Sequence, residues 1–552
     1  MSRKSRIKKG VVDFETDPGE YGQEMLPFAS CIYFNDENNA IIWSKNCAKK
    51  TYDLIATLPR CELYAHNGGK FDFWFFVEFC DPQDVVIING RIAKMYIGKV
   101  VLIDSYLIAP IALDRYKKTA IDYNKFRREN RESHKDEIID YLLSDCKNTL
   151  ELIEASHKIL TKQLTIGAAA MRSIKASGVK VKKLGSRHDK LFRDYFFGGR
   201  VENIQNGHWF YPPKKAAYNI DINSAYPYAM LSDHPHGKGY KQTKKIPRKK
   251  STPYFADIMA VSHGCLPVRC ENGNRELYYP TDNVTRRYHA TGWEIQAGLD
   301  TGTLTIEKIN EVLIPTKTIN FDKFVHFHYG ARLEASARND VLETLIRKNV
   351  LTSGFGKFAT NPEKFYDWAI APVGTDVAGW VDRHNNKTHE GFSWYSDVFG
   401  RALWRRQADE ETREAGYFDV ATAASITGYV RAMTWQAIQH VDTPLYCDTD
   451  GLKCLHDRGL STASKKLGTW KLEMRPVENI VVAKKIHYSR DIDGEEKLAC
   501  KGGRLKYEDL VEMALGLDVT WFADFPTFSA KNGFSYQKRI FRIRKGFSRK
   551  NI

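Results

Sequence analysis

Four acidic residues in the first 150 positions have a spacing suited to metal binding. Asp13 and Glu15 are two apart at the end of the apolar segment VVDFET, so in a strand both side chains would leave the same face. Asp72 follows in AHNGGKFDF, and Tyr141 and Asp145 are four apart, hence on one face of a helix. Clustered carboxylates suit Mg²⁺ or Mn²⁺. Two such ions could activate a water and stabilise the leaving oxygen of a phosphodiester, while Tyr141 orients the water or helps to deprotonate it.

A second set of carboxylates lies farther along the chain. Asp221, in NIDINSAYP, lies at the end of a predicted apolar strand. Asp448 and Asp450 flank Thr449 in the predicted hairpin turn of LYCDTDGLKCL. Asp221 with Asp450 could hold two Mg²⁺ ions, one at a primer 3′-hydroxyl and one at an incoming triphosphate. Tyr226 could pack under the nucleotide sugar, where a flat ring leaves no room for a 2′-hydroxyl.

The segment IRKNVLTSGFGKF, between these acidic residues, predicts a helix with a cation and an aromatic ring on one face. Lys348 and Phe355 are seven residues apart. Lys348 would bring a mobile positive charge to a triphosphate, and Phe355 a flat surface to the nascent base pair. Arg338 and Arg347 could add positive charge, although solvated positions on the helix surface are an equally good interpretation.

The order of these patterns resembles two known sets of motifs, whereas each pattern alone recurs often by chance. D-x-E, N-x3-F-D and Y-x3-D, over residues 13–145, resemble the motifs of DEDDy 3′→5′ proofreading exonucleases. D-x-x-S-x-Y-P, K-x6-F-G and Y-x-D-T-D resemble motifs A, B and C of family B DNA polymerases. The whole chain resembles the protein-primed branch of phage and linear-plasmid replicases, in which the first exonuclease motif begins almost at the N-terminus.

This resemblance implies roles for further residues. Near the first site it implies DNA contacts at Asn67, Phe71 and Ser105, and a basic residue, Lys125, near the scissile phosphate. Near the second it implies nucleotide ligands at Ser224, Tyr226, Lys348, Phe355 and Arg338, and DNA ligands at Gly198, Gly199, Thr449, Lys485 and Tyr488.

The sequence departs from the family pattern at four places. Motif B has Thr352 and Phe355 where N-S-x-Y-G has Asn and Tyr, which affects fine nucleotide selection but not the chemistry. Phe196 replaces the tyrosine of Y-x-G-G, Gly451 replaces the serine after D-T-D, and the expected K-x-Y spacing is one residue longer, from Lys485 to Tyr488.

The hydrophobic pattern indicates an α/β chain of two or more domains, since 552 residues exceed what one core usually serves. VVDFET and KVVLIDSY are typical of buried strands. The pattern of residues 136–160 is typical of an amphipathic helix. The resemblance implies an RNase H-like exonuclease domain at 1–190, then a right-hand polymerase at 191–552. Within the polymerase it implies a palm at about 191–262 and 417–503, a first insertion at about 263–320, fingers at about 321–360, a second insertion at about 361–416 and a thumb at about 504–552. By the same resemblance, the first insertion would hold a terminal protein, and the second would enclose the template for processivity and strand displacement.

The composition favours a nucleic-acid partner. Lys and Arg exceed Asp and Glu by 83 − 67 = 16, and a basic excess suits a polyanion. No apolar run predicts a membrane span, and the ten cysteines are typical of reduced thiols rather than a zinc site. We expect a monomer, cytoplasmic in its host cell if viral, with two Mg²⁺ or Mn²⁺ per active site. The expected partners are primer–template DNA, deoxynucleoside triphosphates, a terminal protein and, as a further candidate, a single-strand-binding protein.

Three alternatives remain open. A nucleic-acid-primed family B polymerase would need an additional N-terminal domain, for which the residues before Asp13 leave no room. A DNA-binding exonuclease with a weakened polymerase half is disfavoured by the intact Asp221, Asp448 and Asp450. A non-catalytic packaging protein would not need the acidic motif residues, since each weakens DNA binding unless a metal neutralises it.

Overall fold

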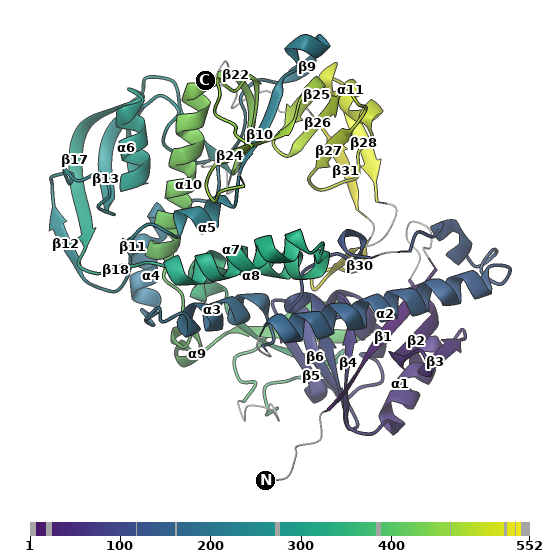
Figure 1. Ribbon diagram of the computed structural model, residues 1–552. Coiled ribbons are helices and arrows are strands. Elements are labelled where there is room, and N and C mark those ends of the chain that lie inside the picture. The colour runs from purple at the N-terminus through teal and green to yellow at the C-terminus, as the bar shows by residue number, and fades with distance from the viewer. Residues whose placement is uncertain are drawn as a thin grey trace.

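The N-terminal part of the chain folds around a seven-stranded mixed sheet (Figure 1). The computed structural model describes residues 7–17, 25–117, 119–160, 163–270, 276–381, 388–463, 465–523, 527–535 and 537–542. In sheet order the strands are β3 (Asn38–Trp43), β2 (Pro27–Asn35), β1 (Lys8–Thr16), β4 (Cys61–Ala65), β7 (Val100–Asp104), β6 (Arg91–Ile97) and β5 (Val85–Ile88). The three central strands β1, β4 and β7 run parallel, and the outer ones pair antiparallel with their neighbours.

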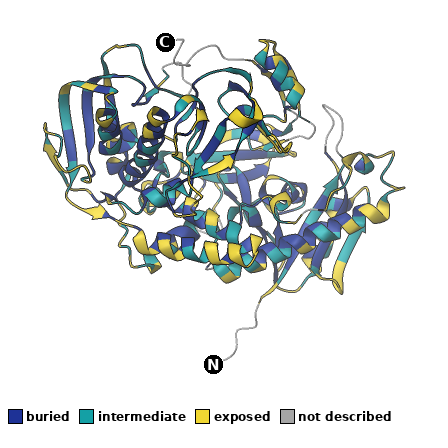
Figure 2. Ribbon diagram, turned by 45° about the horizontal axis from the view of Figure 1, so that its top comes forward, coloured by how far each residue is buried: buried dark blue, intermediate teal, exposed yellow. Residues whose placement is uncertain are grey.

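Helices cover both faces of this sheet, which explains the almost continuous apolar run of β1. Val12 and Phe14 pack in the cluster that contains α1 (Cys47–Thr57). Val11 packs in the cluster that contains α2 (Lys135–Ile159), so Asp13 and Glu15, which share the parity of Val11, lie on the α2 side. Helix α2 has one buried and one exposed side (Figure 2), as its predicted amphipathic pattern requires.

A five-stranded sheet forms the centre of the second part of the chain. Its order is β24 (Trp470–Met474), β10 (Tyr218–Ile222), β23 (Gly451–His456), β22 (Asp442–Asp448) and β8 (Val201–Asn203). Helix α10 (Val420–His440) is almost entirely buried in the same core, together with α5 (Ala225–Ala229) and α6 (Gly292–Asp300). Strands β22 and β23 form the predicted hairpin, because Asp448 pairs with Gly451 across a two-residue turn.

A four-stranded sheet lies at the left edge of Figure 1, beside the core helices. Its order is β12 (Tyr240–Thr243), β17 (Leu304–Pro315), β13 (Phe255–Ser262) and β16 (Arg286–Thr291). The expected boundary at 262/263 therefore falls inside one sheet, since β12 and β13 precede it. Short pairs flank this sheet, namely β11 (His234–Pro235) with β18 (Thr318–Ile319) and β14 (Val268–Arg269) with β15 (Leu277–Tyr278).

Two antiparallel helices, α7 (Asp322–Ala337) and α8 (Val341–Phe358), fill the range 321–360. Helix α8 also packs against α3 (Ile166–Ala176), which follows α2, and α4 (Ser186–Phe192) leads on to the second part of the chain. Gly354 of α8 faces both α7 and α3, since an added Cβ would lie 3.2 Å from Phe324 and 3.4 Å from Ile174. The helix pair is thus packed both on the five-stranded core and on the N-terminal part.

The range 361–416 is rich in β-structure, as expected. Strands β19 (Tyr366–Pro372), β21 (Arg401–Gln407) and β20 (Ser393–Val398) form a sheet, followed by α9 (Glu410–Glu414). Ile370, Val398 and Leu403 belong to the same hydrophobic cluster as the core of the N-terminal sheet.

The C-terminal elements form a further hydrophobic cluster, and one hairpin among them contacts the N-terminal part of the chain. Strands β9 (Gly207–Phe210), β25 (Pro476–Ala483), β26 (Ile486–Asp491) and β27 (Glu496–Cys500) make a sheet, on which α11 (Tyr507–Ala514) and the pair β28 (Val519–Phe522) with β31 (Lys538–Phe541) pack. This cluster spans the expected boundary at 503/504. The hairpin of β29 (Thr527–Ser529) and β30 (Gly533–Ser535) reaches the N-terminal part, where the Phe528 ring lies 4.4 Å from Trp74.

Candidate active sites

The first predicted site is assembled by β1, α2 and a short 3₁₀ helix (Asp72–Phe76). Asp72 is buried, and its Oδ1 accepts the Phe14 N–H at 3.2 Å. Burial and the charges of Asp72, Glu15 and Asp145 hold the pKa of Asp13 well above its usual range. Burial likewise raises the pKa of Asp72 to about 7. The structure therefore brings the four predicted carboxylates together, and we call these residues with Tyr141 the N-terminal site.

Tyr141 lies beside these carboxylates on α2. Burial, then the charges of Asp145 and Glu15, raise the pKa of Tyr141 far above its usual value. Its hydroxyl is 3.4 Å from that of Tyr123. A phenol that stays protonated can donate a hydrogen bond to a water but is a poor base. Of the two roles expected for Tyr141, the environment therefore favours orientation over deprotonation.

Asn67 and Phe71 surround the loop that carries Asp72. Asn67 adopts a left-handed backbone, with φ of 66°, and its Oδ1 accepts a hydrogen bond from Arg91 Nη2 at 2.8 Å. Arg91 also pairs with the buried Asp104, whose pKa is raised to about 6 by burial. The half-buried Phe71 ring packs edge-to-face on Phe534 of the β29–β30 hairpin, with centroids 5.3 Å apart. The sequence reasoning missed the Arg91–Asp104 pair, although Asp104 ends the predicted strand KVVLID.

Two other residues predicted near this site are engaged elsewhere. Ser105 is fully buried, donates to the Ala65 carbonyl at 3.1 Å and lies 3.0 Å from His66 Nδ1. Its side chain does not reach the surface in this conformation, and its role as a DNA ligand stays a prediction. Lys125 pairs with Glu137 at 2.6 Å on the surface next to α2.

The second predicted site is built by the β22–β23 hairpin and the adjoining strand β10. Asp221 lies directly opposite Gly451 on one side and Lys471 on the other. Burial, followed by the charges of Asp221 and Asp448, raises the pKa of Asp450 to about 7. Asp450 is thus within electrostatic range of both Asp221 and Asp448, and we call these three carboxylates the hairpin site.

Two lysines contact the hairpin site. Lys485 Nζ lies 2.8 and 2.9 Å from the two carboxylate oxygens of Asp448, and it was predicted as a DNA ligand nearby. Lys471 Nζ lies 3.3 Å from Asp221 Oδ1 and was not predicted. The alternating pattern of TWKLE indicates a strand, but it does not show which residue lies opposite Lys471. That follows only from the pairing of β24 with β10.

Three residues at this site have positive φ angles that non-glycine residues rarely adopt. They are Ser224 with φ of 55°, Thr449 with 62° and Lys485 with 62°. Such backbone strain is kept where surrounding contacts fix the loops. Ser224 Oγ accepts a hydrogen bond from Arg332 Nη1 at 2.9 Å. Arg338 instead caps α7, is 57% exposed and pairs with Glu343, so Arg332 and not Arg338 contacts motif A.

The aromatic residues of motifs A and B lie in direct contact. The rings of Tyr226 and Phe355 stack with centroids 4.1 Å apart and an interplanar angle of 21°. Lys348, on the same helix as Phe355, lies close enough to lower the pKa values of both Asp221 and Asp450 against the effect of burial. These side chains therefore surround the hairpin site as the motif spacing predicted.

The linker FFGGR passes directly over the hairpin site. A Cβ at Gly199 would come within 2.7 Å of Thr449 and 3.0 Å of the Tyr226 hydroxyl, so only glycine fits there. A Cβ at the exposed Gly198 would meet nothing within 4 Å, which leaves its outer side free for a passing strand.

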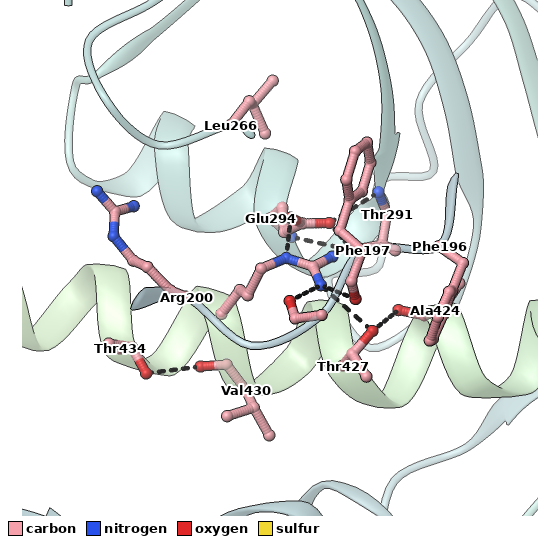
Figure 3. A network of polar contacts seen from close by, with 12 residues as sticks. Phe196, Phe197, Arg200, Leu266, Thr291, Glu294, Ala424, Thr427, Val430 and Thr434 are labelled. Carbon is pink, nitrogen blue, oxygen red and sulfur yellow. Dashed lines mark hydrogen bonds and ion pairs between the residues drawn. The ribbon is translucent and has the colours of Figure 1, made fainter. Parts of the chain in front are cut away.

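A buried arginine, Arg431, holds this linker in place by hydrogen bonds to its carbonyls. Figure 3 shows the surrounding network, with Phe197, Glu294 and Thr427 labelled. Arg431 Nη1 donates to the carbonyls of Phe197 at 2.6 Å and Gly198 at 2.9 Å. Its Nε pairs with the buried Glu294 at 2.7 Å, and Glu294 in turn caps α6 at Thr291. The sequence reasoning missed Arg431, because Glu294 is 137 residues away from it.

Replacing Arg431 by Met is expected to destabilise the protein by about 3 kcal/mol or more, because it leaves Glu294 as an uncompensated buried charge. The measurement is the urea midpoint of unfolding. Arg458→Met is the matched control, since Arg458 and its partner Asp442 are 58% and 43% exposed, and we expect a much smaller shift of the midpoint. Equal midpoints for the two variants would contradict the role of Arg431.

A basic cavity of about 740 Å³ adjoins the hairpin site. Its lining includes Gly199, Lys484, Lys485, Lys501, Arg539 and Arg542. Tyr488, predicted as a DNA ligand, does not take part. It is almost fully buried in the C-terminal cluster, with its hydroxyl donating to Glu496 at 2.7 Å, and its role as a DNA ligand stays a prediction.

The donor chemistry of both sites suits a hard divalent cation, because every predicted ligand is a carboxylate. Burial first, and then like charges that a cation would relieve, raise the pKa values of Asp13 and Asp450. Among the residues that the structure describes, no three His, Cys, Asp or Glu side chains are grouped closely enough in this conformation to enclose a metal ion. At the hairpin site, Asp221 and Asp448 are each in contact with a lysine.

Two of the remaining sequence expectations can be compared with the structure. All ten cysteines are free thiols, eight of them buried. In the described part of the chain, no helix has the length and apolar character needed to cross a membrane.

The fold is that of known DNA polymerases. Phi29 DNA polymerase in an orthorhombic crystal form superposes with a TM-score of 0.70 at 16% identity, covering 98% of this chain and 100% of that one. Its complex with primer–template DNA and incoming nucleotide substrates gives a TM-score of 0.69 at 15% identity, with the same coverage. The mixed α/β class expected from the sequence is thereby confirmed.

Sequence comparison defines the family. Residues 112–376 match the model for DNA polymerase type B, organellar and viral. The chain is 31% identical over 517 residues to the DNA-directed DNA polymerase of Enterobacteria phage PRD1, covering 92% of this chain and 89% of the phage protein. It is also 24% identical over 613 residues to a probable DNA polymerase of Agaricus bitorquis, covering 89% and 73% respectively. The chain belongs to the organellar and viral type B DNA polymerases.

Proposed function

We propose that this DNA-directed DNA polymerase also proofreads, with metal-assisted phosphoryl transfer at two separate carboxylate sites. The observation that carries the proposal is that the residues of each motif set lie close together in the folded chain. Asp221, Asp448 and Asp450 meet beside the Tyr226–Phe355 stack, and Asp13, Glu15, Asp72 and Asp145 meet beside Tyr141.

In this proposal the five-stranded sheet is the palm, and α7 and α8 are the fingers. The C-terminal elements from about residue 504 are the thumb, of which residues 524–526, 536 and 543–552 lie outside the described residues. The seven-stranded sheet with its helices is an RNase H-like exonuclease domain. The four-stranded sheet and the sheet β19–β21–β20 represent the two insertions.

The residues of the hairpin site have distinct proposed tasks. Asp221 and Asp450 would hold two Mg²⁺ or Mn²⁺ ions, which supply positive charge to the attacking and leaving oxygens when bound. Lys348 would bring a mobile ammonium group to the triphosphate, and Arg332 would bring a planar guanidinium group. The Tyr226–Phe355 stack gives the sugar and base a flat, rigid surface.

The N-terminal site would remove a mispaired 3′-terminal nucleotide. Its four carboxylates would hold divalent cations, which would supply positive charge to a bound water there. Tyr141 keeps its proton and orients that water through a hydrogen bond. Asn67, fixed in its left-handed conformation by Arg91, borders the loop of Asp72 and is the candidate contact to the single strand.

The DNA path is proposed to run through the basic cavity beside Asp448. Lys484, Lys485, Lys501, Arg539 and Arg542 can neutralise backbone phosphates of the primer strand. Gly198 and Gly199 leave a flat backbone surface for the template strand, and Thr449 lies beneath them.

A primer with a 3′-terminal mismatch tests the combined function. With Mg²⁺ and all four deoxynucleotides, the 5′-labelled primer should be shortened past the mismatch and then extended to full length. A phosphorothioate at the linkage before the mismatch should delay extension. Extension that retains the mismatch, at the same rate with either linkage, would argue against proofreading.

Replacing Tyr226 by Val is expected to lower discrimination against ribonucleotides by about 10- to 100-fold, because the ring that stacks on Phe355 would no longer exclude a 2′-hydroxyl. Tyr226→Phe keeps the ring and should behave like the unmodified protein. The measurement is the ratio of kcat/KM values for a deoxynucleotide and its ribonucleotide. Unchanged sugar selection in Tyr226→Val would reject Tyr226 as the gate.

We further propose that synthesis starts from a protein hydroxyl and displaces a strand of a linear viral or plasmid genome. The order of the motifs and the two β-rich insertions support this reading over a nucleic-acid-primed polymerase. The partner would be a terminal protein from the same genetic element. Primer-free incubation with that protein and labelled deoxynucleotide should transfer label to it, and failure to do so would favour the nucleic-acid-primed alternative.

A further inference from the structure

Each of two carboxylates at the hairpin site is paired with a lysine. Asp448 pairs with Lys485, and Asp221 pairs with Lys471 of β24. We propose that Lys471 is a positioning residue that holds Asp221 in the metal-free enzyme and is displaced by the divalent cation, so that it sets the metal concentration that synthesis requires. This inference rests on the proposed role of Asp221 as a metal ligand.

The register of the sheet fixes this contact. Strands β10 and β24 are antiparallel, and Asp221 and Lys471 are direct partners, so their side chains leave the same face of the sheet. Both remain accessible, with exposed side-chain fractions of 26% for Asp221 and 39% for Lys471. A cation arriving from solvent can therefore compete with the ammonium group without unfolding the strand pair.

A second carboxylate gives Lys471 an alternative position. Glu473, two residues farther along the same strand, has its Oε1 only 2.9 Å from Lys471 Nζ. When a metal ion takes Asp221, Lys471 can keep its charge paired with Glu473. Displacement then costs less than the loss of a single ion pair, which makes exchange between the two arrangements easy.

Lys497 provides a matched comparison. Its Nζ also pairs with Glu473, at 3.7 Å, but it extends from β27 rather than from the strand beside Asp221. Removing Lys497 deletes a similar charge and a similar partner. An effect specific to Lys471 therefore reports its contact with Asp221 rather than the general charge of this surface.

The test is Mn²⁺ binding by the full-length protein without DNA or nucleotide, measured from the electron paramagnetic resonance signal of free Mn²⁺. The parent carries Asp13→Ala and Glu15→Ala, so that the hairpin site dominates binding. Lys471→Met should bind Mn²⁺ about three- to fivefold more tightly, the range expected for removing a partly exposed ion pair. Lys497→Met should bind like the parent, and Lys471→Arg should restore weaker binding.

The outcomes separate the two levels of the proposal. Unchanged or weaker binding in Lys471→Met, with binding intact in the parent, would overturn the role of Lys471 alone. Binding in the parent that Asp221→Asn and Asp450→Asn leave unaltered would overturn the metal site itself. In activity, Lys471→Met with Asp13 and Glu15 intact should need less Mg²⁺ for half-maximal extension, while the Mg²⁺ dependence of 3′-end degradation stays the same.

Discussion

Replacing Asp450 by Asn is expected to reduce primer extension by about 10³-fold or more while 3′-end degradation continues at its normal rate. Asp450 lies in the hairpin turn, with its pKa raised to about 7 by burial and by Asp221 and Asp448. Losing a metal ligand there removes several kcal/mol of transition-state stabilisation. The measurement compares extension and degradation of one labelled primer by the same preparation.

Asp457→Asn is the control for this change. Asp457 belongs to the next loop, where its carboxylate accepts hydrogen bonds from the backbone N–H groups of Gly459 and Ser461. Its replacement should leave extension nearly unchanged. Equal loss of extension and degradation in Asp450→Asn would contradict two separate sites.

The double change Asp13→Ala and Glu15→Ala is expected to have the opposite effect. Degradation should fall by about 10³-fold or more, because both residues leave the face of β1 that meets Tyr141 and Asp145. Extension of a correctly paired primer should persist. The measurement is single-turnover release of the 3′-terminal nucleotide from single-stranded DNA.

Asp36→Ala provides the comparison for this variant. Asp36 is an exposed aspartate on the same part of the chain, where it binds Tyr33 and Lys147 outside the N-terminal site. Degradation should be normal in Asp36→Ala. Degradation that survived in the double variant would remove Asp13 and Glu15 from the site.

Local sequence pattern places most of the predicted carboxylates, because each of them lies on an element that the pattern itself defines. Asp72, on a short 3₁₀ helix, was selected by the order of the motifs instead. The period-two spacing of Asp13 and Glu15 requires only that β1 is a strand. The four-residue spacing of Tyr141 and Asp145 requires only the helix α2. The two-residue turn between Asp448 and Gly451 follows from the hairpin.

Long-range contacts were not accessible in the same way. Arg431 meets Glu294 and the linker, and Arg332 meets Ser224, only after distant elements pack. Lys471 becomes a neighbour of Asp221 only through the register of two strands that are far apart in sequence. No spacing rule within one segment encodes such pairs.

Two of the predicted DNA ligands are buried in this conformation. Ser105 and Tyr488 match family positions by type and order, yet both side chains lie inside the protein and form internal hydrogen bonds. Arg338 has the right charge on the right helix, but it lies at the turn to α8, whereas Arg332 reaches motif A. Residue type alone does not distinguish an inward side chain from an outward one.

The most direct test of the two-site account uses the unmodified protein, Mg²⁺ and a 5′-labelled primer on a longer template. With deoxynucleotides, we expect extension to the end of the template. Without them, we expect progressive shortening of the same primer from its 3′ end. Shortening in both conditions, with no extension, would contradict the assignment of the hairpin site to DNA synthesis, and extension without shortening would contradict the assignment of the N-terminal site to proofreading.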